Sequence, residues 1–141
     1  MHVLGYLFFN GNAEEALEYY CDVLGGDVDI MRYEGTPAAA HMPADWNNKV
    51  MHGVLRRGDA EILMASDTTD AGGEPQNFSL AIMTRDESEA DHVFAGLSQG
   101  GTVTMPLEKM FWGAKFGMLK DKFGVAWMVN CELSPQGAAA R

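Results

Sequence analysis

The chain has 141 residues, of which 47% are hydrophobic and 21% are charged, and this composition is typical of an ordinary globular protein. Twenty acidic against ten basic residues give a formal net charge of −10, which argues against nucleic acid and anionic membranes as partners. The sequence has no signal-peptide pattern at its start and no apolar run as long as a membrane span. Cys21 and Cys131 lack metal-like spacing, so we expect a cytoplasmic protein with reduced thiols.

The first half begins with a predicted strand and a predicted helix. The stretch "HVLGYLFFNG" (residues 2–11) is apolar and rich in aromatic and β-branched residues, which favours a strand. Asn12, with Glu15 three residues later, resembles a capping box and predicts the start of a helix. The segment "YEGTPAAAHMPADWNNK" (residues 33–49) contains two prolines and is interpreted as a loop or lid.

The second half repeats this plan. The stretch that begins at Tyr6 aligns with one that begins at Leu80, and a second capping box, Asp86 with Glu89, falls at the same offset of 74 positions. Further on, "HGVLRRGDAEILMAS" aligns with "FGMLKDKFGVAWMVN" at an offset of 64 positions. The smaller offset places about ten extra residues in the 33–49 segment. Each half therefore predicts one strand, one helix and then three strands.

These elements predict an α+β fold made of two βαβββ modules, at about residues 1–67 and 77–133. Residues 68–76 would connect the modules, and residues 134–141 would form a flexible tail. A module of this size leaves one sheet face bare. We therefore expect the two curved mixed sheets to pair within a single domain, residues 1–133.

Five stretches resemble the vicinal oxygen chelate superfamily of glyoxalases, bleomycin-resistance proteins and ring-cleaving dioxygenases. They are "YLFFNGNAEEALEYY", "VMHGVL", "ILMASD", "GGTVTMPLEKMFWGAKFG" and "DKFGVAWMVNC", and together they cover most of the chain from Tyr6 to Cys131. The block "FWGAKFG…DKFGVAWM" is similar to the PhnB-like branch, which is often labelled 3-demethylubiquinone-9 3-methyltransferase-like. The resemblance implies a cup-shaped half-barrel around a cavity, and a homodimer whose modules pair within or across chains.

The resemblance also implies where a metal would bind. Metal-dependent members of the superfamily carry up to four His or Glu ligands on the first and last strands of each module, where the ion acts as a Lewis acid. Projected onto this chain, those positions are Gly5, Met64, Ser79 and Met128. None of the four offers a ligand for a hard divalent ion. We therefore expect neither a metal nor another cofactor.

Candidate cavity residues follow from the same projection and from the aromatic stretch near the C-terminus: Phe9, His52, Met64, Ser79, Trp112, Phe116 and Met128. A soft, mostly apolar wall suits a small hydrophobic or aromatic molecule better than a phosphate or a sugar. Two interpretations of His52 stay open, since it is either a structural histidine of an apolar strand or a proton donor in the cavity.

Three functions follow from this sequence. The leading hypothesis is a metal-free small-molecule-binding protein without demonstrable catalysis. The first alternative is a metal-dependent lyase, isomerase or dioxygenase, which would need His41, His52 and Glu61 to converge. The second is a methyltransferase, as the family label suggests. However, "FFNGNAEEA" has a single glycine where most adenosylmethionine-dependent enzymes have a glycine-rich turn.

Overall fold

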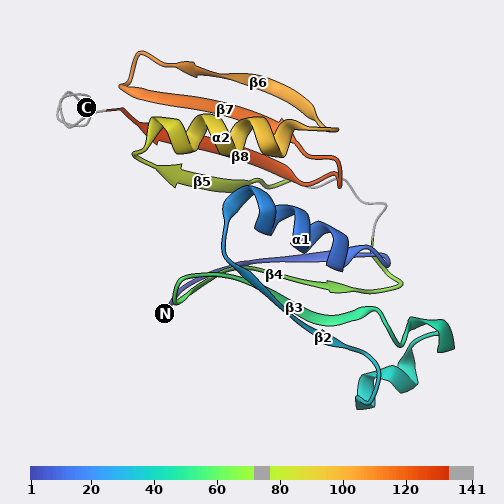
Figure 1. The fold of residues 1–141 in the computed structure, drawn as a ribbon. Helices are drawn as coiled ribbons and strands as arrows, with labels where there is room; N and C mark the ends of the chain where they lie inside the picture. Colours follow the sequence, from blue (N-terminus) through green and yellow to red (C-terminus); the bar gives the residue numbers. More distant parts are fainter. Residues whose placement is uncertain (72–76, 134–141) are drawn as a thin grey trace. The chain divides into compact units, whose positions relative to one another are not determined.

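The computed structural model describes residues 1–71 and 77–133 (Figure 1). These residues form two compact units, one on each side of residues 72–76, and each unit has its own sheet and helix. The expected tail, residues 134–141, and residues 72–76 of the expected connecting loop lie outside the described residues. The pairing of the two sheets around a cup stays a prediction.

The first unit contains a four-stranded mixed sheet. Its elements in chain order are β1 (Gly5–Phe9), α1 (Ala13–Leu24), β2 (Asp27–Arg32), β3 (Val50–Arg57) and β4 (Ala60–Asp67). The strand order is β1-β4-β3-β2, with β1 parallel to β4 and the other pairs antiparallel. The expected loop between β2 and β3 contains two short 3₁₀ helices, η1 (Pro37–His41) and η2 (Ala44–Trp46).

The second unit repeats this topology. Its elements are β5 (Leu80–Thr84), α2 (Glu87–Ser98), β6 (Thr102–Lys109), β7 (Ala114–Lys120) and β8 (Ala126–Glu132). The strand order β5-β8-β7-β6, again with the first and last strands parallel, matches that of the first unit strand for strand. The predicted α+β fold of two βαβββ modules is confirmed, and both sheets are open four-stranded sheets.

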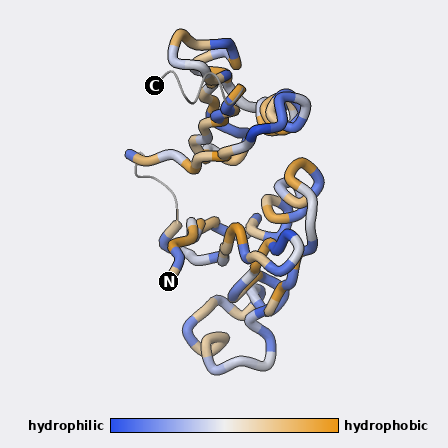
Figure 2. The backbone as a smooth tube through the Cα atoms, turned by 90° about the vertical axis from the view of Figure 1, so that its left-hand side faces the viewer, coloured by the Kyte–Doolittle hydropathy of each residue, from blue (hydrophilic) through white to orange (hydrophobic). Residues whose placement is uncertain are grey.

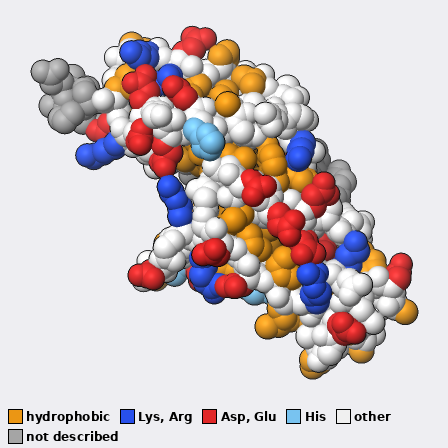
Figure 3. Space-filling model, viewed as in Figure 1, with side chains coloured by type: hydrophobic (Ala, Val, Ile, Leu, Met, Phe, Trp, Pro, Cys, Tyr) orange, Lys and Arg blue, Asp and Glu red, His pale blue; other side chains and the backbone are white. Residues whose placement is uncertain are grey.

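Each helix covers one face of its own sheet (Figure 1). Side chains of α1 at Ala13, Ala16, Leu17 and Tyr20 are fully buried, and they pack on the sheet face that carries residues such as Leu55. Both helices alternate between hydrophilic and hydrophobic residues within each turn (Figure 2). Their outer sides carry acidic side chains (Figure 3). This is the pattern of amphipathic helices on a half-covered sheet.

A glycine sits under each helix at corresponding positions of the two repeats. A Cβ atom at Gly53 would collide with the Leu17 side chain of α1. At Gly117, a Cβ would lie 2.7 Å from Phe94 Cε1 of α2 and 2.9 Å from Leu107 Cα of β6. Since both helices need this space to approach their sheets, the alignment of these two glycines in the sequence reflects equivalent packing.

The two helices begin differently, and one of the two predicted caps is wrong. At α2, the Asp86 carboxylate accepts a hydrogen bond from the Glu89 backbone N–H at 3.1 Å, as the sequence predicts. At α1, Asn12 makes no side-chain capping bond. The Asp67 carboxylate at the end of β4 instead accepts hydrogen bonds from Gly11 N and Ala13 N, both at 2.9 Å. A tertiary contact therefore replaces the local cap.

Among the described residues, no helix is both long and apolar enough to cross a membrane. Cys21 and Cys131 are free thiols, and burial raises the pKa of each above its ordinary value. A raised pKa keeps a thiol protonated near neutral pH, so both cysteines are poor nucleophiles.

Candidate functional site

The face of the first sheet that α1 leaves uncovered is defined by strand register. Alternate residues of a strand point to opposite faces, and directly paired residues of neighbouring strands share a face. Gly53 and Leu55 on β3, with Ala65 and Leu63 opposite them on β4, lie on the helix-covered face. Met64 pairs with Tyr6 on β1 and with Val54 on β3 and therefore lies on the helix-free face.

A row of aromatic rings crosses this helix-free face. The ring centroids of Phe8 and Tyr6 are 5.1 Å apart, and those of Tyr6 and His52 are 5.7 Å apart. The Tyr6 hydroxyl and His52 Nδ1 lie 3.0 Å apart, within hydrogen-bond distance. Phe8 is 62% exposed, and Met31, which pairs with His52 from β2, is 53% exposed. The face is thus largely apolar and aromatic around the Tyr6–His52 pair, and it also carries Ser66 opposite Phe8 and Asp29 opposite Val54.

The helix-free face of the second sheet is rich in methionine. Met128 on β8 pairs with Met118 on β7, which in turn pairs with Met105 on β6. Phe116 pairs with Asn130 on the same face. The ring centroids of Trp112 and Phe116 are 6.2 Å apart. Flexible thioethers beside aromatic rings form an adaptable apolar surface.

Four of the seven expected cavity residues lie on these helix-free faces: His52, Met64, Phe116 and Met128. Trp112 lies in the turn between β6 and β7, against Phe116. The structure places Phe9 elsewhere, because its partner in the register is Asp67 and it is 6% exposed in the core.

The projected metal-ligand positions on the first strands also need a correction. Gly5 pairs with Leu63, so the β1 residue beside Met64 on the helix-free face is Tyr6. Ser79 precedes β5, and the β5 residue beside Met128 is Ala81. The projection was therefore displaced by one residue in the first module and by two in the second. A shift of one residue in a strand moves a side chain to the other face of the sheet.

The corrected set does not fit the superfamily's metal. Tyr6, Met64, Ala81 and Met128 include no histidine and no carboxylate, the ligands that hard divalent ions need. Within residues 1–71 and 77–133, no group of three His, Cys, Asp or Glu side chains could hold an ion. His41, His52 and Glu61 therefore do not converge. Glu61 instead pairs with Arg56, and His41 is exposed at the end of η1.

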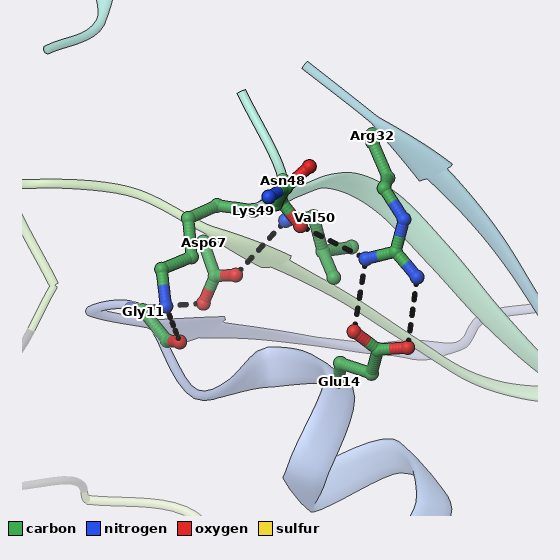
Figure 4. A pocket seen from close by; sticks show the side chains of 7 residues that line it. All are labelled: Gly11, Glu14, Arg32, Asn48, Lys49, Val50 and Asp67. Carbon is green, nitrogen blue, oxygen red and sulfur yellow. Dashed lines mark hydrogen bonds and ion pairs between the residues drawn. The ribbon is translucent and has the colours of Figure 1, made fainter. Parts of the chain in front are cut away.

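A polar hollow of about 470 Å³ lies on another part of the first unit, and the sequence did not predict it (Figure 4). Its lining comes from the β1–α1 turn, α1, the end of β2 and the residues around the start of β3, with the end of β4: Gly11, Glu14, Arg32, Asn48, Lys49, Val50 and Asp67. These residues are far apart in the chain and follow no recognisable spacing, so only the fold brings them together.

The charges of this hollow are balanced within the protein. Arg32 forms two hydrogen bonds with the Glu14 carboxylate, at 2.9 and 3.0 Å, and this contact lowers the pKa of Glu14. Lys49 Nζ donates to the carbonyl of Gly11 at 2.9 Å, and Val50 N donates to Asp67 at 3.0 Å. Two cations face two carboxylates, and these contacts hold the loop between β2 and β3 against α1.

The loop is also anchored at its base by Tyr33. This residue is 5% exposed, and its hydroxyl donates to the Asp67 carbonyl at 2.6 Å. Burial raises the pKa of Tyr33, so the phenol stays protonated and remains a donor. The Tyr33 ring also contacts Trp46 in η2, with centroids 6.5 Å apart. The loop is thus joined to the sheet beside the polar hollow.

Comparisons with known proteins agree with this architecture. The chain is 41% identical to protein PA1353 from Pseudomonas aeruginosa, with a TM-score of 0.81 over 95% of this chain and 99% of that one. It is 29% identical to a PhnB protein from Bacillus cereus whose name proposes a 3-demethylubiquinone-9 3-methyltransferase, with a TM-score of 0.71 over 93% and 99% of the two chains. Protein YjdN from Escherichia coli K12 is 27% identical over 89% of this chain and 91% of its own length.

The match to a family model is equally broad. Residues 2–129 match the model of the glyoxalase/bleomycin resistance protein/dioxygenase superfamily, which covers both repeated modules and nearly all described residues. The chain belongs to the glyoxalase/bleomycin resistance protein/dioxygenase superfamily.

Proposed function

We propose that this protein binds a small hydrophobic or aromatic molecule without a metal, on the helix-free faces of its sheets. The observation that supports this most directly is the chemistry of those faces. Met64 and Met128 stand where the superfamily resemblance implies metal ligands, and their neighbours are aromatic rings and further methionines. Such a surface offers apolar contact and little for a sugar or a phosphate.

The exposed apolar side chains on these faces supply the driving force for ligand binding. Phe8 on the first sheet is 62% exposed, and Met83 on β5 of the second sheet is 68% exposed. Each 100 Å² of apolar surface removed from water contributes about 2.5 kcal/mol. A flat ligand that covers two or three of these side chains would therefore gain several kcal/mol before the costs of association are subtracted.

The proposal includes a cytoplasmic homodimer. The family resemblance supports the dimer, and the two free thiols fit a reducing compartment. Edge strand β6 also exposes Val103 and Met105, which are 44% and 39% accessible in the single chain. Light scattering on a size-exclusion column tests the dimer, since a monomer at micromolar concentration would contradict it.

The binding proposal is tested by thermal shift with a panel of planar aromatic compounds, hydrophobic antibiotics and quinones. A compound at 100 times its Kd stabilises the folded state by about 2.7 kcal/mol, which is readily measured. We expect Met64→Lys and Met128→Lys to abolish the shift, because each places a charge on an apolar face. Ala95→Lys on the exposed side of α2 makes the same charge change and should leave the shift intact. A panel without any shift would contradict the proposal.

Two further measurements decide between this proposal and its alternatives. Elemental analysis of protein purified without chelator should show much less than one metal per chain. One tightly held Ni, Zn, Mn or Fe would favour a metal-dependent lyase, isomerase or dioxygenase. A thermal shift with adenosylmethionine would favour the methyltransferase suggested by the name of the Bacillus cereus neighbour, and we expect none.

A further inference from the structure

The aromatic row on the first sheet contains one polar pair, Tyr6 and His52. Both side chains are half-buried, and the Tyr6 hydroxyl lies 3.0 Å from His52 Nδ1. Around them the helix-free face carries Phe8, Met31 and Met64. A polar pair among apolar side chains restricts what can cover this face, because a covered donor without an acceptor is costly.

The chemistry of the two groups favours one direction for their hydrogen bond. A phenol O–H is more acidic than the N–H of a neutral imidazole and is therefore the better donor. With the Tyr6 hydroxyl as the donor, His52 Nδ1 is the acceptor. A neutral imidazole that accepts at Nδ1 carries its proton on Nε2. Tyr6 thus sets the tautomer of His52.

The Nε2–H donor of His52 has no acceptor among residues 1–71 and 77–133. Nε2 lies on the side of the ring remote from the backbone, so the donor is available to a molecule on the helix-free face. The aromatic row continues from the His52 ring to Tyr6 and Phe8, with centroid distances of 5.7 and 5.1 Å. Rings at this spacing offer a stacking surface to a planar molecule.

We propose that His52, oriented by Tyr6, donates an Nε2–H hydrogen bond to a neutral oxygen acceptor of a planar aromatic ligand stacked on the Phe8–Tyr6–His52 row. The ligand class is an aromatic ketone, quinone or amide, and this assignment rests on the proposed function. A neutral acceptor is favoured over an anion because the nearby methionines offer no counter-charge. The nearby cation, Arg56, is already paired with Asp29, two residues before Met31 on β2, and with Glu61 on β4.

A matched pair of probes tests this assignment. 1-Acetylnaphthalene and 1-ethylnaphthalene have nearly the same shape, but only the ketone has an oxygen acceptor. By equilibrium dialysis, we expect the wild type to bind the ketone about tenfold more tightly, which corresponds to about 1.4 kcal/mol. His52→Phe keeps an aromatic ring and should bind both probes equally. His92→Phe on the exposed side of α2 is the control and should keep the preference.

The outcomes separate the two proposals. Equal binding of both probes by the wild type would overturn the role of His52 while the apolar binding function stands. Absence of binding by either probe up to its solubility would overturn the proposed function and the His52 anchor with it. An unchanged preference in His52→Phe would also overturn the anchor, since the ketone would then be recognised elsewhere.

A second measurement needs no ligand. Nitrogen-15 NMR of the neutral imidazole side chains reports which ring nitrogen carries the proton, and comparison with His52→Gln assigns the signals. We expect His52 to be protonated at Nε2 only, and Tyr6→Phe to give a mixture of the two tautomers. This measurement tests the orientation of His52 by Tyr6, and the paired probes test the ligand role of Nε2. Protonation at Nδ1 in the wild type would overturn the inference.

Discussion

Asp67 is a buried carboxylate that joins three segments of the first unit. It is 1% exposed and accepts hydrogen bonds from Gly11 N, Ala13 N and Val50 N, while its own carbonyl accepts from Tyr33. These bonds connect β4 to the start of α1, to the start of β3 and to the loop. In the second unit, Asp121 has a similar role within one turn, where it accepts from Phe123 N, Val125 N and Trp127 Nε1.

Replacing Asp67 tests this joint. Asp67→Ala would leave three backbone N–H groups without an acceptor, and each such loss costs about 1 to 3 kcal/mol. We expect the free energy of unfolding to fall by at least about 3 kcal/mol, as measured by urea denaturation. Asp59→Ala in the exposed turn before β4 removes the same group and should change stability by less than about 0.5 kcal/mol. Equal effects of the two variants would show that Asp67 is not a joint.

The ion pair of Glu14 with Arg32 contributes to the free energy of unfolding, and this contribution depends on pH. Its pKa is lowered from 4.5 chiefly by the hydrogen bonds from Arg32, so the folded state binds the proton less readily than the unfolded chain. The contribution is therefore present above pH 4.5 and is lost as the pH falls through the lower pKa of the folded state. The pair is more than one-third exposed, at 41% and 39%, so the contribution is small.

Comparison with Glu14→Gln isolates this contribution. We expect the variant to be less stable than the wild type by about 0.5 kcal/mol at pH 7, and the difference to shrink as the pH falls below 4.5. Urea denaturation of both proteins at a series of pH values measures it. A difference that stays constant down to the lowest pH at which both proteins fold would contradict the pairing with Arg32.

At the scale of elements, the internal repeat allowed the fold to be predicted from sequence. The two offsets identified the first strand, the helix and the last two strands of each module, because binary patterns and terminal glycines are local features. The cap of α1 could not be found in this way, since its acceptor lies on β4, far from Asn12 in the chain. The face of β1 was also misassigned, because register depends on pairing partners and a slip of one residue reverses the face. On β5 the slip was two residues, which keeps the face and changes only the position along the strand.

The paired glycines beneath the helices lead to a prediction with opposite outcomes in the two units. Gly53→Ala should destabilise the protein by about 1 to 3 kcal/mol, because the new methyl group collides with Leu17. Leu17→Ala should partly relieve that collision, so the double variant should be more stable than the sum of the single effects predicts. Urea denaturation of the four proteins gives the coupling energy.

Gly117 should not be rescued in the same way. A methyl group there would also lie 3.0 Å from the backbone nitrogen of Leu107, which no side-chain change removes. Gly117→Ala combined with Phe94→Ala should therefore show little or no favourable coupling. Equal rescue in both units would mean that contact with the helix side chain, and not the β6 backbone, limits the space at Gly117.

At the scale of the whole molecule, only part of the candidate site could be predicted from the sequence. His52, Met64, Phe116 and Met128 lie on helix-free faces, because strand alternation places them there once the strands are known. The Tyr6–His52 pair and the polar hollow depend on neighbours across strands and loops, and no spacing in the sequence indicates them. What covers the two helix-free faces depends on contacts made by the whole chain.

The last prediction concerns what covers the two helix-free faces. If the bare faces are covered by pairing of the two modules, within or across chains, then the modules should unfold as one cooperative unit. The tryptophans allow each module to be followed separately, because Trp46 lies in the first unit and Trp112 and Trp127 lie in the second. Trp46→Phe leaves reporters only in the second unit, and Trp112→Phe combined with Trp127→Phe leaves only Trp46.

We expect both reporter proteins to lose stability when Gly53→Ala is added, although that substitution contacts only the first unit. A shift confined to the Trp46 reporter would show that the modules fold independently, and would leave each helix-free face to be covered by ligand or solvent alone.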